Sequence, residues 1–176
     1  MQQLRAYADS LGIDALGICA PVAPAEEAAK HGKWLARGFG AEMHYLARNP
    51  DARYDARSLL PGCRSVVVIA VSYFLPEVEW PDEGEPKVSR YAWGDDYHDV
   101  LKEKLVALAA WLDGNVSGQH HKPCVDTSPL TEKAFAVAAG IGWQGRNSLV
   151  LNRELGSYFF IGLLLTTAEL PIGMCI

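Results

Sequence analysis

The run of residues 65–73, SVVVIAVSY, constrains the fold of this chain more than any other segment. It is continuously apolar, rich in β-branched side chains, and does not alternate between apolar and polar positions. A strand of this kind is buried on both faces, so we expect it at the centre of a sheet with covering elements on each side. A chain of 176 residues is long enough to build one domain around such a core.

The neighbouring segments supply the cover for this strand. Periodicity and end signals predict helices over residues 2–11, 24–37, 42–48, 97–111 and 128–139, and strands over 15–19, 122–125, 148–152 and 157–165. The last two strands are joined by a loop that contains Gly156, and we expect them to form a hairpin. We interpret residues 49–61 as a loop and residues 74–87 as an exposed one. The predicted class is α/β (α+β), with one mixed sheet and flanking helices in a single domain.

Charge and cysteine usage exclude several classes of protein. The 16 Lys and Arg against 21 Asp and Glu give a net charge of −5, which does not indicate a basic nucleic-acid-binding domain, although a local basic patch stays open. The 4 cysteines form no Cys-x-x-Cys pair, and we assign no metal ligands. We expect Cys19 and Cys63 to be buried, inert thiols.

The sequence also indicates where the protein works. Its longest apolar run, residues 158–165, is too short to span a bilayer, and its first ten residues lack the apolar core of a signal peptide. We therefore expect a cytoplasmic protein with reduced thiols and no membrane association.

Asp126 is the first candidate for chemistry. It lies between a predicted strand and Ser128-Pro129, which we interpret as a helix start because serine caps helices and proline suits the first helical position. A side chain at such a junction faces a crevice at the sheet edge. A carboxyl group screened from water there can keep its proton near neutral pH and act as a general acid. The alternative is that Asp126 only helps to cap the helix.

Residues 140–148, GIGWQGRNS, form a second candidate. Three glycines allow the backbone to approach a ligand closely, and Arg146 and Asn147 can bind amides, phosphates or carboxylates. The alternative is a tight connection with Trp143 packed on the core.

The segment SRYAWGDDYH, just before a long predicted helix, is the third candidate. Trp93 and Tyr97 can line a pocket, and Arg90 can meet a phosphate. The alternative is that Asp95 or Asp96 caps the helix while the aromatic rings pack.

These segments together resemble the epoxyqueuosine reductase family, specifically the part that binds cobalamin. The segments that carry the resemblance are MHYL with RYDARSLLPGCRSVVVIAVSY, then SRYAWGDDYHDVLKEKL, then VDTSPLTEKAFAVAAGIGWQGRNSLVLNRELGSYFFIGLLLT. The resemblance extends from Leu4 to about Leu170. It implies a fold related to cobalamin-dependent reductive dehalogenases and, more distantly, to nitroreductase-like flavoproteins. The implied reaction is the reduction of epoxyqueuosine to queuosine at the wobble position of tRNA anticodons.

The resemblance also implies roles for single residues. Asp126 matches the aspartate that protonates the epoxide oxygen, after electrons from an external donor and iron–sulfur clusters have reduced the cobalt of base-off cobalamin. The implied cobalamin contacts are Arg53, Ser89, Asp126, Thr131, Asn147, Val150 and Ile161, with Val150 and Ile161 contributing mainly backbone groups.

The chain departs from the family pattern after residues 170–171. The family continues there into a ferredoxin-like module with clustered cysteines, whereas residues 172–176 contain Cys175 alone. We therefore expect residues 1–170 to form the cobalamin-binding catalytic domain and residues 171–176 to be the truncated start of the iron–sulfur domain, a fragment not competent alone. Two alternatives stay open: a cobalamin-binding module without turnover, and a flavin reductase of nitroreductase-like fold.

Overall fold

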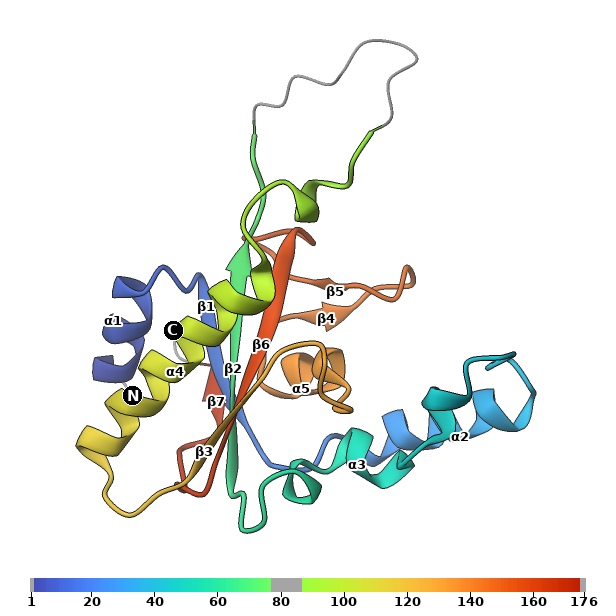
Figure 1. The fold of residues 1–176 in the computed structure, drawn as a ribbon, viewed down its shortest axis with the longest axis horizontal. Coiled ribbons are helices and arrows are strands. Elements are labelled where there is room, and N and C mark those ends of the chain that lie inside the picture. The colour runs from blue at the N-terminus through green and yellow to red at the C-terminus, as the bar shows by residue number, and fades with distance from the viewer. Residues whose placement is uncertain (1, 77–86, 175–176) are drawn as a thin grey trace.

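The computed structural model of the chain describes residues 2–76 and 87–174 (Figure 1). The helical elements are α1 (Gln2–Ser10), α2 (Ala25–Ala36), η1 (His44–Ala47), α3 (Pro50–Tyr54), η2 (Ala56–Ser58), η3 (Arg90–Ala92), α4 (Tyr97–Asn115) and α5 (Glu132–Ala138), where η marks a 3₁₀ turn. The strands are β1 (Ala15–Cys19), β2 (Ser65–Ser72), β3 (His121–Cys124), β4 (Trp143–Gln144), β5 (Val150–Leu151), β6 (Phe159–Thr166) and β7 (Gly173–Met174). Most of the loop predicted over residues 74–87 lies outside the described residues.

The main sheet has the strand order β3-β6-β2-β1-β7, which places β2 in the middle (Figure 1). β2 pairs along its whole length with β6, and it pairs with β1 on its other side. Its residues from Ser65 to Ala70 are buried, so the predicted central strand is confirmed. The α+β class is confirmed as well, but each pairing in the sheet is antiparallel rather than mixed.

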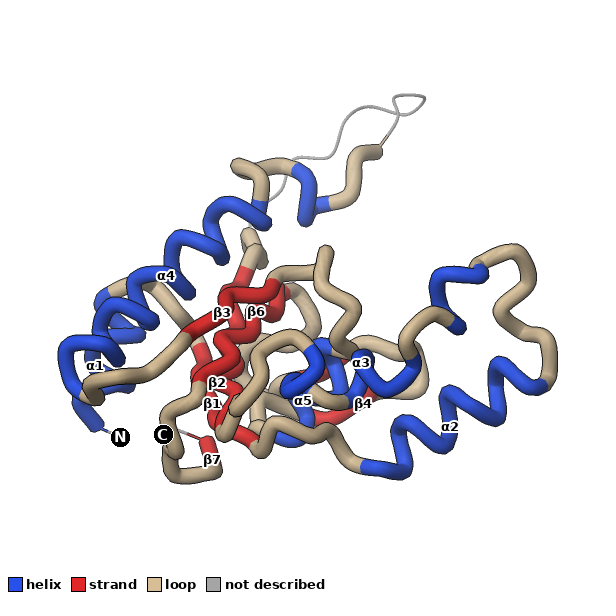
Figure 2. Tube along the Cα trace, turned by 60° about the horizontal axis from the view of Figure 1, so that its bottom comes forward, coloured by secondary structure: helices blue, strands red, loops and turns tan. Residues whose placement is uncertain are grey.

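Alternate residues of β2 enter two separate cores, one on each face of the sheet. Val67 and Ile69 pack against α1 and α4, whereas Val66 and Val68 pack with Phe135 of α5 on the opposite face. Figures 1 and 2 show the helices on these two sides. Helix α4 contributes four fully buried leucines, Leu101, Leu105, Leu108 and Leu112. Each buried leucine stabilises the fold by about 1.5–3 kcal/mol relative to an exposed one, so this helix is firmly seated.

The predicted hairpin of residues 148–152 and 157–165 is wrong. β5 pairs with β4 in a separate two-stranded sheet, in which Gln144 lies opposite Val150. β6 instead enters the main sheet between β2 and β3. The apolar β6 strand thereby hydrogen-bonds along both of its edges, which satisfies backbone groups that a single hairpin partner would leave half paired.

The predicted helix start at residues 128–129 is also wrong, because α5 begins at Glu132. The Thr131 N–H donates a hydrogen bond to the carbonyl oxygen of Arg53 at 2.9 Å, and Leu130 is buried. These two anchors keep the chain irregular up to residue 131, so the serine and proline lie outside the helix.

The remaining boundaries differ less from prediction. The segment 49–61, predicted as a loop, contains α3 and η2, while 42–48 forms only the short turn η1. Helix α4 continues to Asn115 rather than ending at residue 111. Helix α2 projects away from the sheet with no buried side chain (Figure 2). Within residues 2–76 and 87–174, no helix is both long and apolar enough to cross a membrane.

Candidate active site

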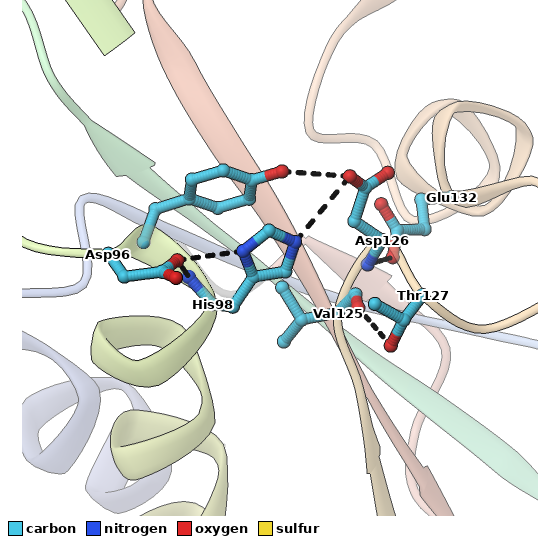
Figure 3. A network of polar contacts seen from close by, with 7 residues as sticks. Asp96, His98, Val125, Asp126, Thr127 and Glu132 are labelled. Carbon is cyan, nitrogen blue, oxygen red and sulfur yellow. Dashed lines mark hydrogen bonds and ion pairs between the residues drawn. The ribbon is translucent and has the colours of Figure 1, made fainter. Parts of the chain in front are cut away.

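Asp126 lies in the loop that joins β3, an edge strand, to α5. Its φ angle is +45°, in the left-handed region that residues with a Cβ rarely adopt. The Thr127 N–H donates to the carbonyl oxygen of Val125, which closes a tight turn around Asp126. The Thr127 hydroxyl donates to the same oxygen at 3.1 Å (Figure 3). Unusual backbone conformations of this kind cluster at functional sites, and here the turn directs the Asp126 carboxylate toward α4.

Two side chains from the first turn of α4 contact that carboxylate. The Tyr97 hydroxyl donates a hydrogen bond to Asp126 Oδ2 at 2.8 Å, and His98 Nε2 lies 3.6 Å from the same oxygen. On the far side of the imidazole, His98 Nδ1 lies 2.7 Å from Asp96 Oδ1 (Figure 3). The hydrogen bond to Asp96 raises the pKa of His98, and the nearby Asp126 carboxylate adds to this shift. Burial, with the bond to Asp126, raises the pKa of Tyr97, so its hydroxyl remains a donor.

Glu132 holds the backbone of the same loop. Its Oε1 accepts a hydrogen bond of 2.5 Å from the Asp126 N–H (Figure 3). Burial of the carboxyl raises the pKa of Glu132 to about 7, and the Asp126 carboxylate also acts to raise it, whereas the hydrogen bond from the N–H and the nearby His98 oppose the shift.

Asp126 does not act as the helix cap. The residue that precedes α5 is Thr131, so the capping interpretation of Asp126 is wrong. The Asp126 side chain is 64% exposed, which means that the described residues do not screen it from water as the sequence had led us to expect. Its carboxylate is positioned by α4 and open to a ligand that approaches from outside.

A row of aromatic rings connects this network to the loop before α4. The ring of Tyr97 stacks on Phe160 with centroids 4.3 Å apart and planes 4° apart. Phe160 contacts Tyr73 at 4.5 Å, and Tyr73 meets Tyr158 edge to face at 5.6 Å. The two tyrosines at the end of the row line a cavity of about 400 Å³, together with Ser89, Arg90, Tyr91, Leu149 and Ser157.

The alternative for the segment before α4 is partly correct. Asp96 caps the helix by accepting a 2.9 Å hydrogen bond from the His98 N–H. Tyr97 packs as described, but the segment also lines the cavity beside Ser89. Packing and pocket formation therefore coexist.

The expected cobalamin contacts fall into neighbouring groups. Arg53 and Thr131 are joined by their backbone hydrogen bond, and Val150 and Ile161 belong to one apolar cluster. Val150 is buried, with only 4% of the residue exposed. Asn147 is exposed, and its Oδ1 accepts a 3.2 Å hydrogen bond from the N–H of residue 149, which lines the cavity beside Ser89. Ser89 lines that cavity and Asn147 bonds a residue that does, whereas Arg53, Thr131, Val150 and Ile161 do not line it.

The glycine-rich loop is explained largely by internal packing. A Cβ added at Gly142 would lie 2.0 Å from the carbonyl oxygen of Leu151, so glycine allows β4 to approach β5. Trp143, in contrast, is 48% exposed and is not packed on the core as the alternative expected. The buried thiols Cys19 and Cys63 are confirmed, and burial raises the pKa of Cys19 to about 12. Among the residues that the structure describes, no three His, Cys, Asp or Glu side chains are grouped so as to hold a metal ion.

The sequence did not assign roles to His98 and Glu132. The misplaced helix start put Glu132 one turn inside a helix, where an acidic residue needs no special explanation. No local signal marks the contact of Glu132 with Asp126, because it depends on the left-handed turn at Asp126.

Comparison with known proteins identifies relatives of the chain. Residues 53–127 match the family described as "Epoxyqueuosine reductase QueG, DUF1730". The chain is 41% identical to an epoxyqueuosine reductase of Gloeobacter violaceus, over 96% of the chain and 52% of the relative. It is 43% identical to one of a Synechocystis species, over 86% of the chain and 53% of the relative. The chain is related to the epoxyqueuosine reductases. It spans about half the length of the curated relatives it matches.

Solved structures of epoxyqueuosine reductases share the fold. The enzyme from Streptococcus thermophilus superposes with a TM-score of 0.85 at 28% identity, over 97% of this chain and 46% of the other. One solved with an epoxyqueuosine-modified tRNA-Tyr stem loop gives 0.80 at 27%, with the same coverage. The Bacillus subtilis structure, described with an aspartate catalytic loop swung out of the active site, gives 0.78 at 26%, over 97% and 45%.

More distant structures share the fold alone. A reductive dehalogenase described in connection with B12-dependent dehalogenation matches with a TM-score of 0.53 at 19% identity, over 96% of this chain and 20% of the other. The expected fold relationship between epoxyqueuosine reductases and reductive dehalogenases is confirmed.

Proposed function

We propose that this chain is the part of an epoxyqueuosine reductase that carries the proton donor for the reduction of epoxyqueuosine in tRNA to queuosine. The observation that carries the proposal is the Asp126 carboxylate, held by Tyr97 and His98 in a chain that matches epoxyqueuosine reductases over almost its whole length. The same matches favour this function over a cobalamin carrier without turnover or a flavin reductase.

Asp126 gives its proton to the oxygen that is released when the epoxide opens. For this transfer the carboxyl must come within about 2.6–3.2 Å of that oxygen, or reach it through one water. Tyr97 and His98 fix the direction of the carboxyl, which is open to an incoming base. Bases of single-stranded RNA loops can be splayed out into such a site.

The proposed cofactor is base-off cobalamin, which when bound supplies the electrons that open the epoxide. The residues proposed to hold it are Arg53, Ser89, Asp126, Thr131, Asn147, Val150 and Ile161. Their support is the sequence resemblance, together with the adjacency of Arg53 to Thr131 and of Val150 to Ile161. Titration of the chain with cob(II)alamin should give a base-off spectrum with a 1:1 endpoint. An unchanged spectrum at saturating cofactor would contradict a binding site formed by this chain.

The remaining parts of the proposal concern the complete protein. Residues 1–170 are proposed as the cobalamin-binding domain, with an external donor and iron–sulfur clusters held outside this chain supplying electrons. A relative solved with a modified tRNA stem loop supports tRNA as the substrate. A tRNA substrate also suits the proposed cytoplasmic location.

The test is a substitution of Asp126 in a complete reductase that contains this chain. Asp126→Asn keeps the shape of the side chain but cannot deliver the proton, so queuosine formation in tRNA, measured by mass spectrometry, should fall by about 10²–10⁴-fold. Cobalamin should still bind, because the other six proposed contacts remain. The matched control is Asp95→Asn, an exposed aspartate in the loop before α4, which should keep normal turnover. Near wild-type turnover of the Asp126 variant would end the assignment.

A further inference from the structure

The loop around Asp126 is held at two different points. Its carboxylate contacts Tyr97 and His98, and its backbone N–H donates to Glu132. The first pair of contacts comes from α4, whereas the second comes from the first residue of α5. The turn is therefore fixed between two helices that pack on opposite faces of the sheet.

The hydrogen bond to Glu132 is made by the backbone of Asp126, the residue with the least favourable conformation in this loop. Asp126 has a left-handed φ of +45°, which is unfavourable for a residue with a Cβ. A residue in this conformation persists only where the surroundings impose it. The Asp126 N–H is directed at the Glu132 carboxylate, and a charged acceptor makes a stronger hydrogen bond than a neutral one.

From these contacts we propose that Glu132 is a positioning residue, whose bond to the Asp126 N–H holds the loop in the conformation that brings the Asp126 carboxylate to Tyr97 and His98. We call this hydrogen bond, from the Asp126 N–H to Glu132 Oε1, the latch. Its importance for catalysis rests on the proposed function, whereas its effect on the loop conformation does not. A relative with its aspartate catalytic loop swung out of the active site shows that the corresponding region can move in that protein.

The charged and titratable groups around Glu132 give the latch a pH dependence. Asp126 disfavours the charged carboxylate of Glu132 and His98 favours it, and Tyr97 and Cys124 also interact with Glu132. Burial places the pKa of Glu132 at about 7. The carboxylate that forms above this pH accepts the N–H more strongly than the protonated acid does below it. The Asp126 amide should therefore become better protected as the pH rises through 7.

Amide hydrogen exchange of the Asp126 N–H, followed by NMR in the full chain without cofactor or tRNA, tests the latch directly. With rates corrected for intrinsic exchange, Glu132→Ala should lower the protection of this amide by roughly 10- to 100-fold, the factor that corresponds to one charge-assisted hydrogen bond. Amides of β2 should keep their protection. The control Glu26→Gln, at an exposed glutamate in the first turn of α2, should change neither.

Glu132→Gln gives a second, independent readout. Its side-chain oxygen still accepts the N–H but does not titrate, so protection should stay near the low-pH wild-type value and lose its rise through pH 7. If Glu132→Ala unfolds the chain, this pH profile decides. Unchanged Asp126 protection in a folded Glu132→Ala, or a Glu132→Gln profile that rises like the wild type, would overturn the latch. Neither result would bear on the proton-donor test, which measures turnover of the Asp126 variant.

Discussion

Tyr97 and Asp126, 29 residues apart in the sequence, are joined by a 2.8 Å hydrogen bond between α4 and the loop after β3. The hydroxyl donates because burial and the neighbouring carboxylate both keep it protonated. The Tyr97 ring is itself fixed by its stack on Phe160 of β6. The carboxylate is thus oriented by a rigid element, the arrangement that a positioned acid requires.

Removal of this hydroxyl should reduce turnover without unfolding the protein. Tyr97→Phe keeps the stack on Phe160 but deletes the donor to Asp126. A hydrogen bond to a charged group contributes about 1.5–3 kcal/mol, so kcat for queuosine formation in a complete reductase should fall by roughly 10- to 100-fold. Tyr7→Phe, at a tyrosine of α1 that likewise keeps its ring stack, on Trp111, is the control and should leave kcat unchanged. Equal losses in both variants would argue against orientation by Tyr97.

The titration of His98 should depend on Asp96. Asp96→Asn removes the charge that raises the His98 pKa, so an NMR titration should show this pKa moving down toward its ordinary value. Asparagine caps helices about as well as aspartate, so α4 should remain intact. Because the folded-state pKa of His98 is raised, the pair stabilises the wild type fully below the unfolded value, and this contribution is lost as pH rises through the folded value. An unchanged His98 titration in the variant would contradict the ion pair.

Ionisation of the buried Glu132 carboxyl should lower the free energy of unfolding at pH 8. Its folded-state pKa of about 7 lies above the ordinary 4.5, so wild-type stability falls as pH rises from 4.5 to 7, where the buried carboxyl must ionise. Glu132→Gln has no carboxyl to ionise, so it should be more stable than wild type by about 1–3 kcal/mol at pH 8. The two proteins should converge below pH 5.

Urea unfolding at pH 5 and pH 8 measures this difference. Glu26→Gln, exposed on α2, should show the same stability relative to wild type at both pH values. A Glu132→Gln variant that loses stability on going from pH 5 to pH 8 as the wild type does would show that Glu132 is not the titrating group.

The central strand could be predicted because its information is local. Residues 65–70 are apolar without alternation, and only a position covered on both faces buries them all. The partner of β6 could not be predicted in this way. Its alternatives, a hairpin with β5 or a place between β2 and β3, satisfy the same local pattern, and the choice depends on contacts between segments far apart in sequence.

The candidate site was predicted in part for the same reason. Asp126 stands out because it directly follows a strand, which is a local signal. Glu132 and His98 have meaning only once the loop folds back, because their contacts with Asp126 depend on the left-handed turn and on the true start of α5. Thr131 illustrates the physical cause of the error, since its N–H bonds to distant Arg53 instead of starting a helix near Ser128.

The glycine-rich loop offers a test that separates packing from ligand binding. A methyl group at Gly142 would meet the carbonyl oxygen of Leu151 at 2.0 Å, and a backbone atom cannot move aside as a flexible side chain can. Gly142→Ala should therefore destabilise the isolated chain by about 1–3 kcal/mol or more, as overpacking does. The control is Gly32→Ala in exposed α2, where no atom lies within 4 Å and the change should stabilise the helix by about 0.5–1 kcal/mol. Urea denaturation without cofactor measures both. If Gly142→Ala leaves stability intact and weakens only cobalamin binding, the glycine serves the approach of a ligand rather than the packing of β4 on β5.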